Sequence, residues 1–125
     1  MTFNPLSFPA EERAPSLRTI SATELLSRDW PPRENLLSPW LPKQGLAMLY
    51  GMRGLGKSHF ALGIAWAIAT GGEFLRWSAP KAANVLYIDG EMCGPLLNKW
   101  LAEIVGDAPL IPDGLKFLTP DEQER

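Results

Sequence analysis

Residues 51–58 have the types and spacing needed to hold a nucleoside triphosphate. They match the pattern G-x-x-x-x-G-K-[ST] at every fixed position, with Gly51, Gly56, Lys57 and Ser58. Glycines allow successive backbone N–H groups to turn inward around an anion. Lys57 can then reach the β- and γ-phosphates, and the Ser58 hydroxyl can ligate Mg²⁺. The motif therefore predicts a site for ATP with Mg²⁺.

We expect the whole loop and the residue after it to contact the nucleotide. The candidates are Gly51, Met52, Arg53, Gly54, Leu55, Gly56, Lys57, Ser58 and His59. Arg53 occupies a variable position of the motif, for which a solvated side chain is the default. A lone histidine on the first turn of an apolar helix is more often packing than chemistry, so we expect His59 to offer mainly its backbone N–H.

Two carboxylates follow a later apolar run, in the sequence Asp89-Gly90-Glu91. The carboxyl ends of parallel strands face the ligand crevice of a sheet. Carboxylates placed there can bind Mg²⁺ or orient an attacking water. Both also suit a turn and a helix start ahead of Pro95, where the helix dipole favours acids. The candidates are Glu91 for the chemical step and, secondarily, Asp89 for Mg²⁺.

The elements that must position these residues alternate between strand and helix. The predicted elements are strands at residues 46–50, 84–89 and 115–118, and helices at residues 59–70 and from Pro95 to Gly106. The first two strands are short apolar runs of the kind buried on both faces of a sheet. The first helix ends at Gly71, a usual helix stop. This order predicts an α/β fold with a parallel sheet and right-handed crossovers.

The N-terminal part of the chain differs from the rest in composition. Residues 1–18 combine prolines and charges without apolar periodicity, which predicts a flexible tail. Ser21 and Glu24 have the spacing of a capping box ahead of a short helix. Prolines deny regular helix and central strand to residues 31–42, which we expect to wrap over the core. We therefore place an N-terminal segment at residues 1–40 and a nucleotide-binding domain at residues 41–125.

Composition narrows the class of protein further. The chain has 125 residues, 46% of them apolar, which suits one domain. A net charge of −2 excludes an overall basic field for nucleic acid or acidic membranes. The single cysteine, Cys93, excludes an intramolecular disulfide, and the longest apolar run is about half of a membrane span. We expect a cytoplasmic protein that does not contact membranes.

Residues 41–97 resemble the RecA-like ATPases of the plasmid replication helicase RepA type. The likeness lies in PKQGLAMLYGMRGLGKS, in the apolar helix that follows, and in NVLYIDGEM. It implies a partial RecA-like P-loop NTPase core, with ATP and Mg²⁺ as cofactors. It also implies a homo-oligomer, a hexameric ring, that acts on single-stranded DNA in replication or repair. By position, Glu91 inherits the role of the acid that activates the hydrolytic water, and Lys57 is the second expected catalytic residue.

The resemblance stops short of the whole family pattern. Those ATPases continue into a further strand that ends in the Walker B aspartate, and then into DNA-contacting loops and an arginine finger. This sequence ends at Arg125, so we expect a C-terminally truncated chain with nucleotide binding and weak or absent turnover alone. Two alternatives stay open. One is a P-loop small-molecule kinase in which Asp89 closes the apolar run 85–88, and the other is a non-hydrolysing nucleotide-binding remnant.

Overall fold

The computed structural model describes residues 16–123, and their contacts divide the chain into two units. The first unit ends at Pro32, and the second begins at Arg33. Most of the tail predicted at residues 1–18 lies outside the described residues. In the described part of the chain, no helix is both long enough and apolar enough to cross a membrane. All residues of the predicted nucleotide site belong to the second unit.

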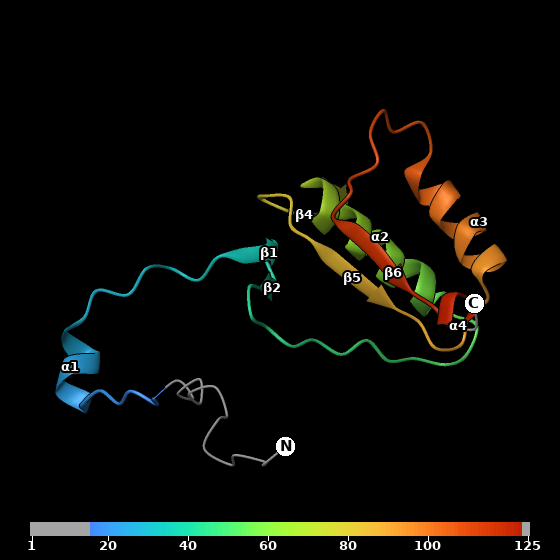
Figure 1. Ribbon diagram of the computed structural model, residues 1–125. Helices are drawn as coiled ribbons and strands as arrows, with labels where there is room; N and C mark the ends of the chain where they lie inside the picture. The colour runs from blue at the N-terminus through green and yellow to red at the C-terminus, as the bar shows by residue number, and fades with distance from the viewer. Residues whose placement is uncertain (1–15, 124–125) are drawn as a thin grey trace, which may run out of the picture. The chain divides into compact units, whose positions relative to one another are not determined.

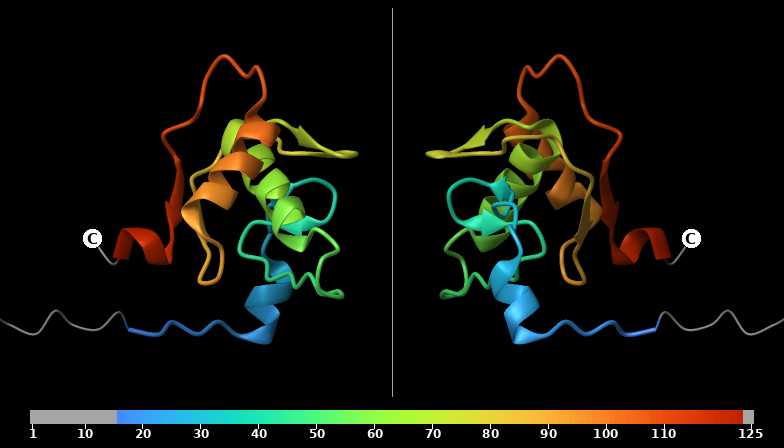
Figure 2. Two further views of the ribbon diagram at one scale, coloured as in Figure 1. Left: turned by 90° about the vertical axis from the view of Figure 1, so that its right-hand side faces the viewer. Right: turned by 90° about the vertical axis from the view of Figure 1, so that its left-hand side faces the viewer.

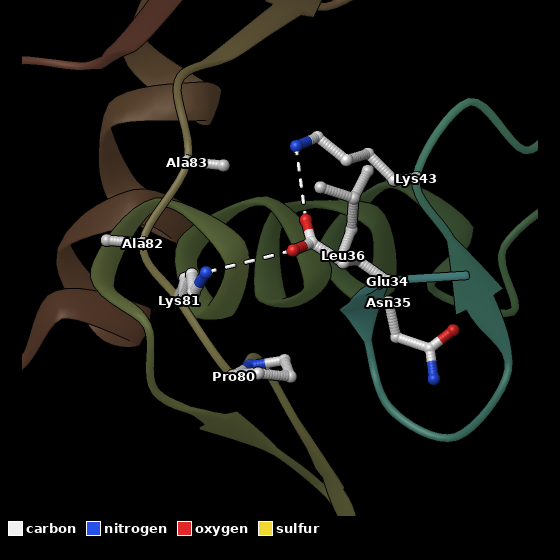
Figure 3. A pocket seen from close by; sticks show the side chains of 8 residues that line it. All are labelled: Glu34, Asn35, Leu36, Lys43, Pro80, Lys81, Ala82 and Ala83. Atoms are coloured by element: carbon white, nitrogen blue, oxygen red, sulfur yellow. Dashed lines mark hydrogen bonds and ion pairs between the residues drawn. The ribbon is translucent and has the colours of Figure 1, made fainter. Parts of the chain in front are cut away.

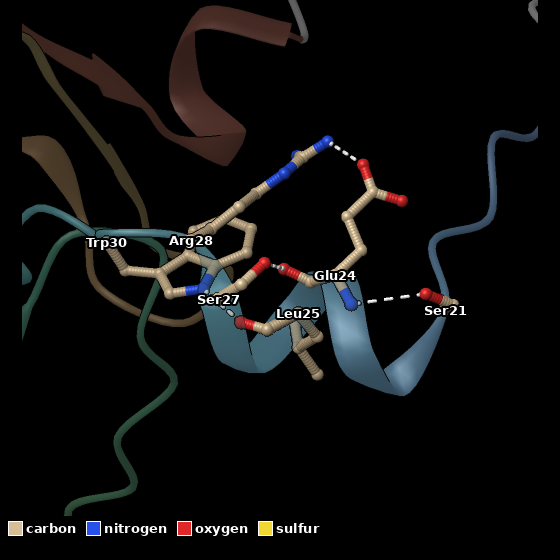
Figure 4. Close-up of polar contacts among 6 residues, drawn as sticks. All are labelled: Ser21, Glu24, Leu25, Ser27, Arg28 and Trp30. Atoms are coloured by element: carbon tan, nitrogen blue, oxygen red, sulfur yellow. Dashed lines mark hydrogen bonds and ion pairs between the residues drawn. The ribbon is translucent and has the colours of Figure 1, made fainter.

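Helix α1 (Ala22–Ser27), in the first unit, begins at the predicted cap (Figure 4). The Ser21 hydroxyl accepts a hydrogen bond from the Glu24 backbone N–H at 3.1 Å, which satisfies a free donor of the first turn. The Glu24 carboxylate pairs with the Arg28 guanidinium, 2.6 Å away, instead of completing the box. Arg28 also lies 5.8 Å from the centroid of the Trp30 ring. The capping prediction is therefore confirmed for its Ser21 half.

Helix α2 (Lys57–Thr70) is the central element of the second unit. It begins at Lys57, slightly before the predicted start, and ends where Gly71 takes a left-handed conformation with φ 68°. Its buried residues are Leu62, Gly63, Ala65, Ala67, Ile68 and Ala69. A helix that is apolar on most sides needs cover from several directions. Accordingly, α2 contacts strands as well as a second helix.

Strands β5 (Val85–Ile88) and β6 (Leu115–Leu118) form a two-stranded parallel sheet, as the order of the elements predicts. The register pairs Val85 with Leu115, Leu86 with Lys116, Tyr87 with Phe117 and Ile88 with Leu118. Helix α3 (Gly94–Val105) connects the two strands, and the short helix α4 (Pro120–Gln123) follows β6. The predicted second helix and last strand are thereby confirmed.

Helices α2 and α3 cover the same face of this sheet (Figures 1 and 2). Burial alternates along β5 accordingly, with Val85 and Tyr87 half-buried and with Leu86 and Ile88 exposed. The prediction that this strand is buried on both faces is therefore wrong. The reason is the arrangement of the helices, because both lie on one side and leave the other side of the sheet open.

Residues 46–50 form no strand, so the prediction of a first core strand there is wrong. Leu46 is fully exposed, and Met48 and Tyr50 are 86% and 87% exposed. The run is apolar, but a strand also needs a neighbouring strand to pair its backbone groups. Among the described strands, β5 and β6 pair only with each other. Most of the run instead lines an apolar groove that it shares with Phe60 of α2.

Two short strands precede α2 in the sequence, and two follow it. They are β1 (Asn35–Leu37), β2 (Leu41–Pro42), β3 (Glu73–Phe74) and β4 (Trp77–Ser78), paired as two antiparallel hairpins. Leu37 has no exposed surface and lies in the core with Ala67, Ile68 and Ala79. The prediction that residues 31–42 only cover the core is therefore wrong at this position. Prolines exclude long regular strands there, but they permit the short paired strand that turns Leu37 inward.

The packing between α2 and the β3–β4 hairpin is aromatic. The Phe60 ring centroid lies 5.2 Å from that of Phe74 and 5.8 Å from that of Trp77, and both pairs are nearly perpendicular. The Phe74 ring also lies against the backbone of α2 at Gly63, where an added Cβ atom would overlap it. This close approach fixes the position of α2 and explains a glycine in the middle of the helix.

Candidate nucleotide-binding site

The loop before α2 reaches the helix through two left-handed glycines. Gly54 has φ 84° and Gly56 has φ 88°. This region costs other residues about 1–2 kcal/mol. Gly56 is the residue that precedes α2, which begins at Lys57. A Cβ atom at either glycine would meet no atom of residues 16–123 within 4 Å, so glycine is required by backbone conformation and not by space.

Backbone donors in this loop are free to bind a ligand. Within the described part of the chain, the N–H groups of Gly54 and Gly56 donate no hydrogen bond. Both lie at the N-terminal end of α2, where the first turn adds free N–H groups and partial positive charge. The variable positions Met52, Arg53 and Leu55 are exposed. An arrangement of this kind favours an anion such as a phosphate group.

The Lys57 ammonium group bends back over the loop. Its Nζ donates hydrogen bonds to the backbone carbonyls of Gly51 and Met52, each at 2.8 Å. These bonds hold the ammonium group against the first residues of the same loop. A phosphate oxygen can replace a carbonyl acceptor, because hydrogen bonds between two charged groups are shorter and stronger. Ser58, half-buried on the same first turn, is the loop residue that could ligate Mg²⁺.

The His59 side chain lies against α3. Its Nε2 is 3.4 Å from the Glu103 carboxylate, and its ring centroid is 6.1 Å from that of Trp100, in an edge-to-face arrangement. The imidazole therefore connects the first turn of α2 to the neighbouring helix. These contacts agree with the interpretation of His59 as a packing residue.

Strand β5 is joined to the same turn of α2. The Tyr87 hydroxyl donates a hydrogen bond of 3.5 Å to the backbone carbonyl of Ser58. Burial raises the pKa of Tyr87 above its usual value, and the negative charge of Asp89 adds to the effect. The hydroxyl therefore stays protonated as a donor at neutral pH. The phosphate loop and the turn after β5 consequently lie at the same end of α2 (Figures 1 and 2).

The turn after β5 carries the two predicted carboxylates in different surroundings. Asp89 is half-buried, and its Oδ1 accepts hydrogen bonds from the backbone N–H groups of Glu91 and Met92, each at 2.9 Å. The Glu91 side chain is exposed. Glu91 is thus the carboxylate open to solvent and ligands, whereas Asp89 is engaged with the backbone of its own turn.

Sequence reasoning missed the contact of Tyr87 with Ser58. The sequence contains a weak signal for this contact, because side chains alternate along a strand and residues 85, 87 and 89 therefore share one face. The sequence does not show which face meets α2. For metal ligands, the structure adds no new candidates, since the described residues contain no group of three or more His, Cys, Asp or Glu side chains able to hold an ion.

Another cavity, of about 260 Å³, lies between the start of β1 and residues 80–83 (Figure 3). Glu34 faces two lysines there, with Lys43 Nζ 3.2 Å and Lys81 Nζ 3.8 Å from its carboxylate oxygens. The hydrogen bond and charge of Lys43, and then the charge of Lys81, lower the pKa of Glu34. All three groups are largely exposed, and the ammonium groups already face a carboxylate. We therefore assign no ligand to this cavity.

A glycine loop with free N–H donors at a helix start, beside a parallel sheet, is typical of nucleotide-binding α/β domains. Residues 10–125 match the family described as AAA domain. This match covers most of the chain, and the chain therefore belongs to that family, whose domains are nucleotide-binding and ATPase-like. The mixed helices and strands with a small parallel sheet are compatible with such a domain. No curated protein matches the chain, and no solved structure matches it.

Proposed function

We propose that this chain binds ATP with Mg²⁺ in the loop of residues 51–58. The observation that carries the proposal concerns the left-handed Gly54 and Gly56 at the N-terminal end of α2, whose two backbone N–H groups donate no hydrogen bond within residues 16–123. Unpaired donors at a helix start favour a multiply charged anion, since each N–H gains an acceptor and the helix dipole adds attraction.

Lys57 and Ser58 have distinct parts in this proposal. Lys57 exchanges the carbonyls of Gly51 and Met52 for oxygens of the β- and γ-phosphates. The Ser58 hydroxyl ligates Mg²⁺, which supplies positive charge that offsets the phosphates when it is bound. Arg53 stays in solvent. The loop suits ATP with Mg²⁺ because its backbone N–H groups and one ammonium group can bind phosphates and its one hydroxyl can ligate the metal ion.

For hydrolysis, we propose that Glu91 orients the attacking water as a general base, with Lys57 as its catalytic partner on the phosphates. Glu91 is exposed and belongs to the turn after β5, the turn that lies at the same end of α2 as the loop, and this supports the assignment. Asp89, the secondary candidate for Mg²⁺ from the sequence, is not assigned to the metal ion in this proposal. Its engagement with two backbone N–H groups makes it a less suitable binding group for a phosphate acceptor, which argues against the kinase alternative.

The finer assignment is a RecA-like ATPase of the RepA helicase type. In this proposal, several copies of the chain form a ring, a hexamer, that acts on single-stranded DNA in replication or repair in the cytoplasm. Membership of the AAA domain family supports an ATPase-like activity. The resemblance of residues 41–97 to replication helicases supports the DNA-linked role.

Binding of fluorescent ATP and ADP with Mg²⁺ tests the proposal. Wild type should bind, and Lys57→Ala should lower the affinity by about 10-fold or more, because a charged hydrogen bond to phosphate is lost. Lys99→Ala removes an exposed lysine of α3 and should leave the affinity unchanged. A folded wild-type chain that binds neither nucleotide would refute the proposal. Hydrolysis measured with and without single-stranded DNA then tests the helicase-type assignment.

A further inference from the structure

The turn that follows β5 is closed by a side chain. Asp89 Oδ1 accepts hydrogen bonds from the backbone N–H groups of Glu91 and Met92, both at 2.9 Å. One carboxylate oxygen thus holds two successive donors of residues 91 and 92. Asp89 is half-buried, and the next two residues are exposed. The direction of the backbone at Glu91 is therefore set by Asp89.

Packing at Gly90 does little to hold this turn. Among the described residues Gly90 lies in open space, since a Cβ atom added there would meet none of their atoms within 4 Å. Gly90 itself also gives the chain more conformational freedom than any other residue. Without the Asp89 acceptor, residues 90–92 would sample many conformations, and the Glu91 side chain would move with them. The two hydrogen bonds are the observed restraint on the turn.

We propose that Asp89 is a positioning residue that presents Glu91 at the end of β5. This inference rests on the proposed function, in which Glu91 acts at bound ATP. Asp89 works through the backbone of Glu91 and need not touch the nucleotide or the metal ion. Tyr87 ties β5 to Ser58 of the first turn of α2, so the strand that Asp89 follows is itself anchored next to the phosphate loop.

Positioning and metal binding by Asp89 require different chemistry. Positioning needs only an oxygen acceptor at Oδ1, which an asparagine amide also supplies. Binding of Mg²⁺ depends on the negative charge, because Mg²⁺ prefers carboxylates and phosphates. Asp89→Asn should therefore preserve a positioning role and impair a metal-binding role. Asp89→Ala should impair both.

Amide hydrogen exchange in the nucleotide-free chain, measured by NMR, tests the restraint directly. Asp89→Ala should speed exchange at Glu91 and Met92 by about 10-fold or more, because two charged hydrogen bonds are lost. In Asp89→Asn, exchange at these two amides should stay close to the wild-type rate. The same holds for the control Asp107→Ala, which removes an exposed acid after α3. Unchanged exchange in Asp89→Ala would overturn the inference, even if ATP binds as proposed.

Addition of ATP with Mg²⁺ tests the link to the site. In wild type and in Asp89→Asn, the Glu91 resonances should shift along with those of Gly54 and Gly56. In Asp89→Ala, the resonances of Gly54 and Gly56 should shift and those of Glu91 should not. The affinity for ATP should stay close to that of wild type. A Glu91 shift retained in Asp89→Ala, or one missing in ATP-bound wild type, would overturn the inference. So would a loss of Mg²⁺-dependent affinity in Asp89→Asn of about 10-fold, the size expected for a lost charged contact.

These outcomes separate the inference from the proposed function. If the loop glycines of wild type do not shift with ATP, the proposed nucleotide site fails, and the positioning role fails with it. If the glycines shift and only the Glu91 results disagree, ATP binding stands and the role of Asp89 is rejected.

Discussion

The hydroxyl of Tyr87 and the backbone carbonyl of Ser58 are joined by a hydrogen bond of 3.5 Å, although 29 positions separate the two residues. Ser58 lies on the first turn of α2, directly after the glycine loop, and Tyr87 lies in β5, two residues before Asp89. The bond therefore connects the proposed phosphate site to the strand that carries Glu91. Apolar contacts between a helix and a strand are non-directional, whereas a hydrogen bond fixes their relative position.

Tyr87→Phe should weaken this connection and keep the ring, whose centroid lies 5.4 Å from that of Phe117. We expect the free energy of unfolding to fall by about 0.5 kcal/mol, the lower end of the range for one hydrogen bond, because the contact is long. Urea unfolding measures this change. Tyr50→Phe is the matched control, because the exposed Tyr50 should tolerate it without loss. An equal loss in both variants would argue against the Tyr87 bond.

Stability at alkaline pH should depend on Tyr87. Burial and, to a smaller extent, the charge of Asp89 raise the pKa of its hydroxyl above the usual value of about 10. The folded chain therefore holds this proton more tightly than the unfolded chain does. The contribution of Tyr87 is fully present below about pH 10 and is lost as the pH rises through its folded-state pKa. Urea unfolding across this range should show a shallower decline for Tyr87→Phe, and an identical decline would contradict the raised pKa.

Gly56→Ala should impair the loop. Alanine at φ 88° costs about 1–2 kcal/mol, so the loop should leave the left-handed conformation or destabilise the start of α2. We expect weaker ATP binding in a fluorescence titration. Gly51→Ala is the comparison, since Gly51 is not left-handed and its added Cβ would meet side chains alone, Leu55 Cδ1 at 3.3 Å and Lys57 Cδ at 3.9 Å. Equal losses of affinity in the two variants would indicate a steric effect in place of a conformational one.

Gly63→Ala should destabilise the fold although alanine is the better helix former. The added methyl group would overlap the Phe74 ring, which neighbouring aromatic rings hold in place. We expect a loss of about 1–3 kcal/mol in the free energy of unfolding, typical of overpacking. Combining Gly63→Ala with Phe74→Leu should recover part of this loss. A stabilised single variant would contradict the close contact.

Leu37→Ala should be among the most damaging apolar truncations. Leu37 has no exposed surface, so its removal leaves a cavity that should cost about 2–5 kcal/mol. Leu46→Ala removes the same atoms from a fully exposed side chain and should change stability by less than about 0.5 kcal/mol. Thermal or urea unfolding of both variants compares them. A larger effect at Leu46 would indicate that residues 46–50 are packed in solution.

Much of the candidate site could be predicted because its determinants are local. The glycine loop, the start of α2 and the turn acids at Asp89 and Glu91 lie within short stretches whose residue types set their backbone conformation. The helix after the loop and its stop at Gly71 were predicted for the same reason, whereas the parallel pairing of β5 with β6 was predicted from the order of strands and helices along the chain. The failures concern partners that are distant in sequence. Residues 46–50 have the composition of a strand, and composition does not supply a strand to pair with.

The sequence by itself determined the chemistry available at residues 51–58, because spacing and residue type decide where N–H groups, an ammonium group and a hydroxyl can gather. Tertiary structure alone decided that Leu37 enters the core, that one face of β5 stays open, and that Tyr87 reaches Ser58. It also separated the two acids, placing Asp89 against the backbone and leaving Glu91 exposed. The physical reason is that burial and pairing depend on which surfaces meet, and those surfaces come from segments far apart in the chain.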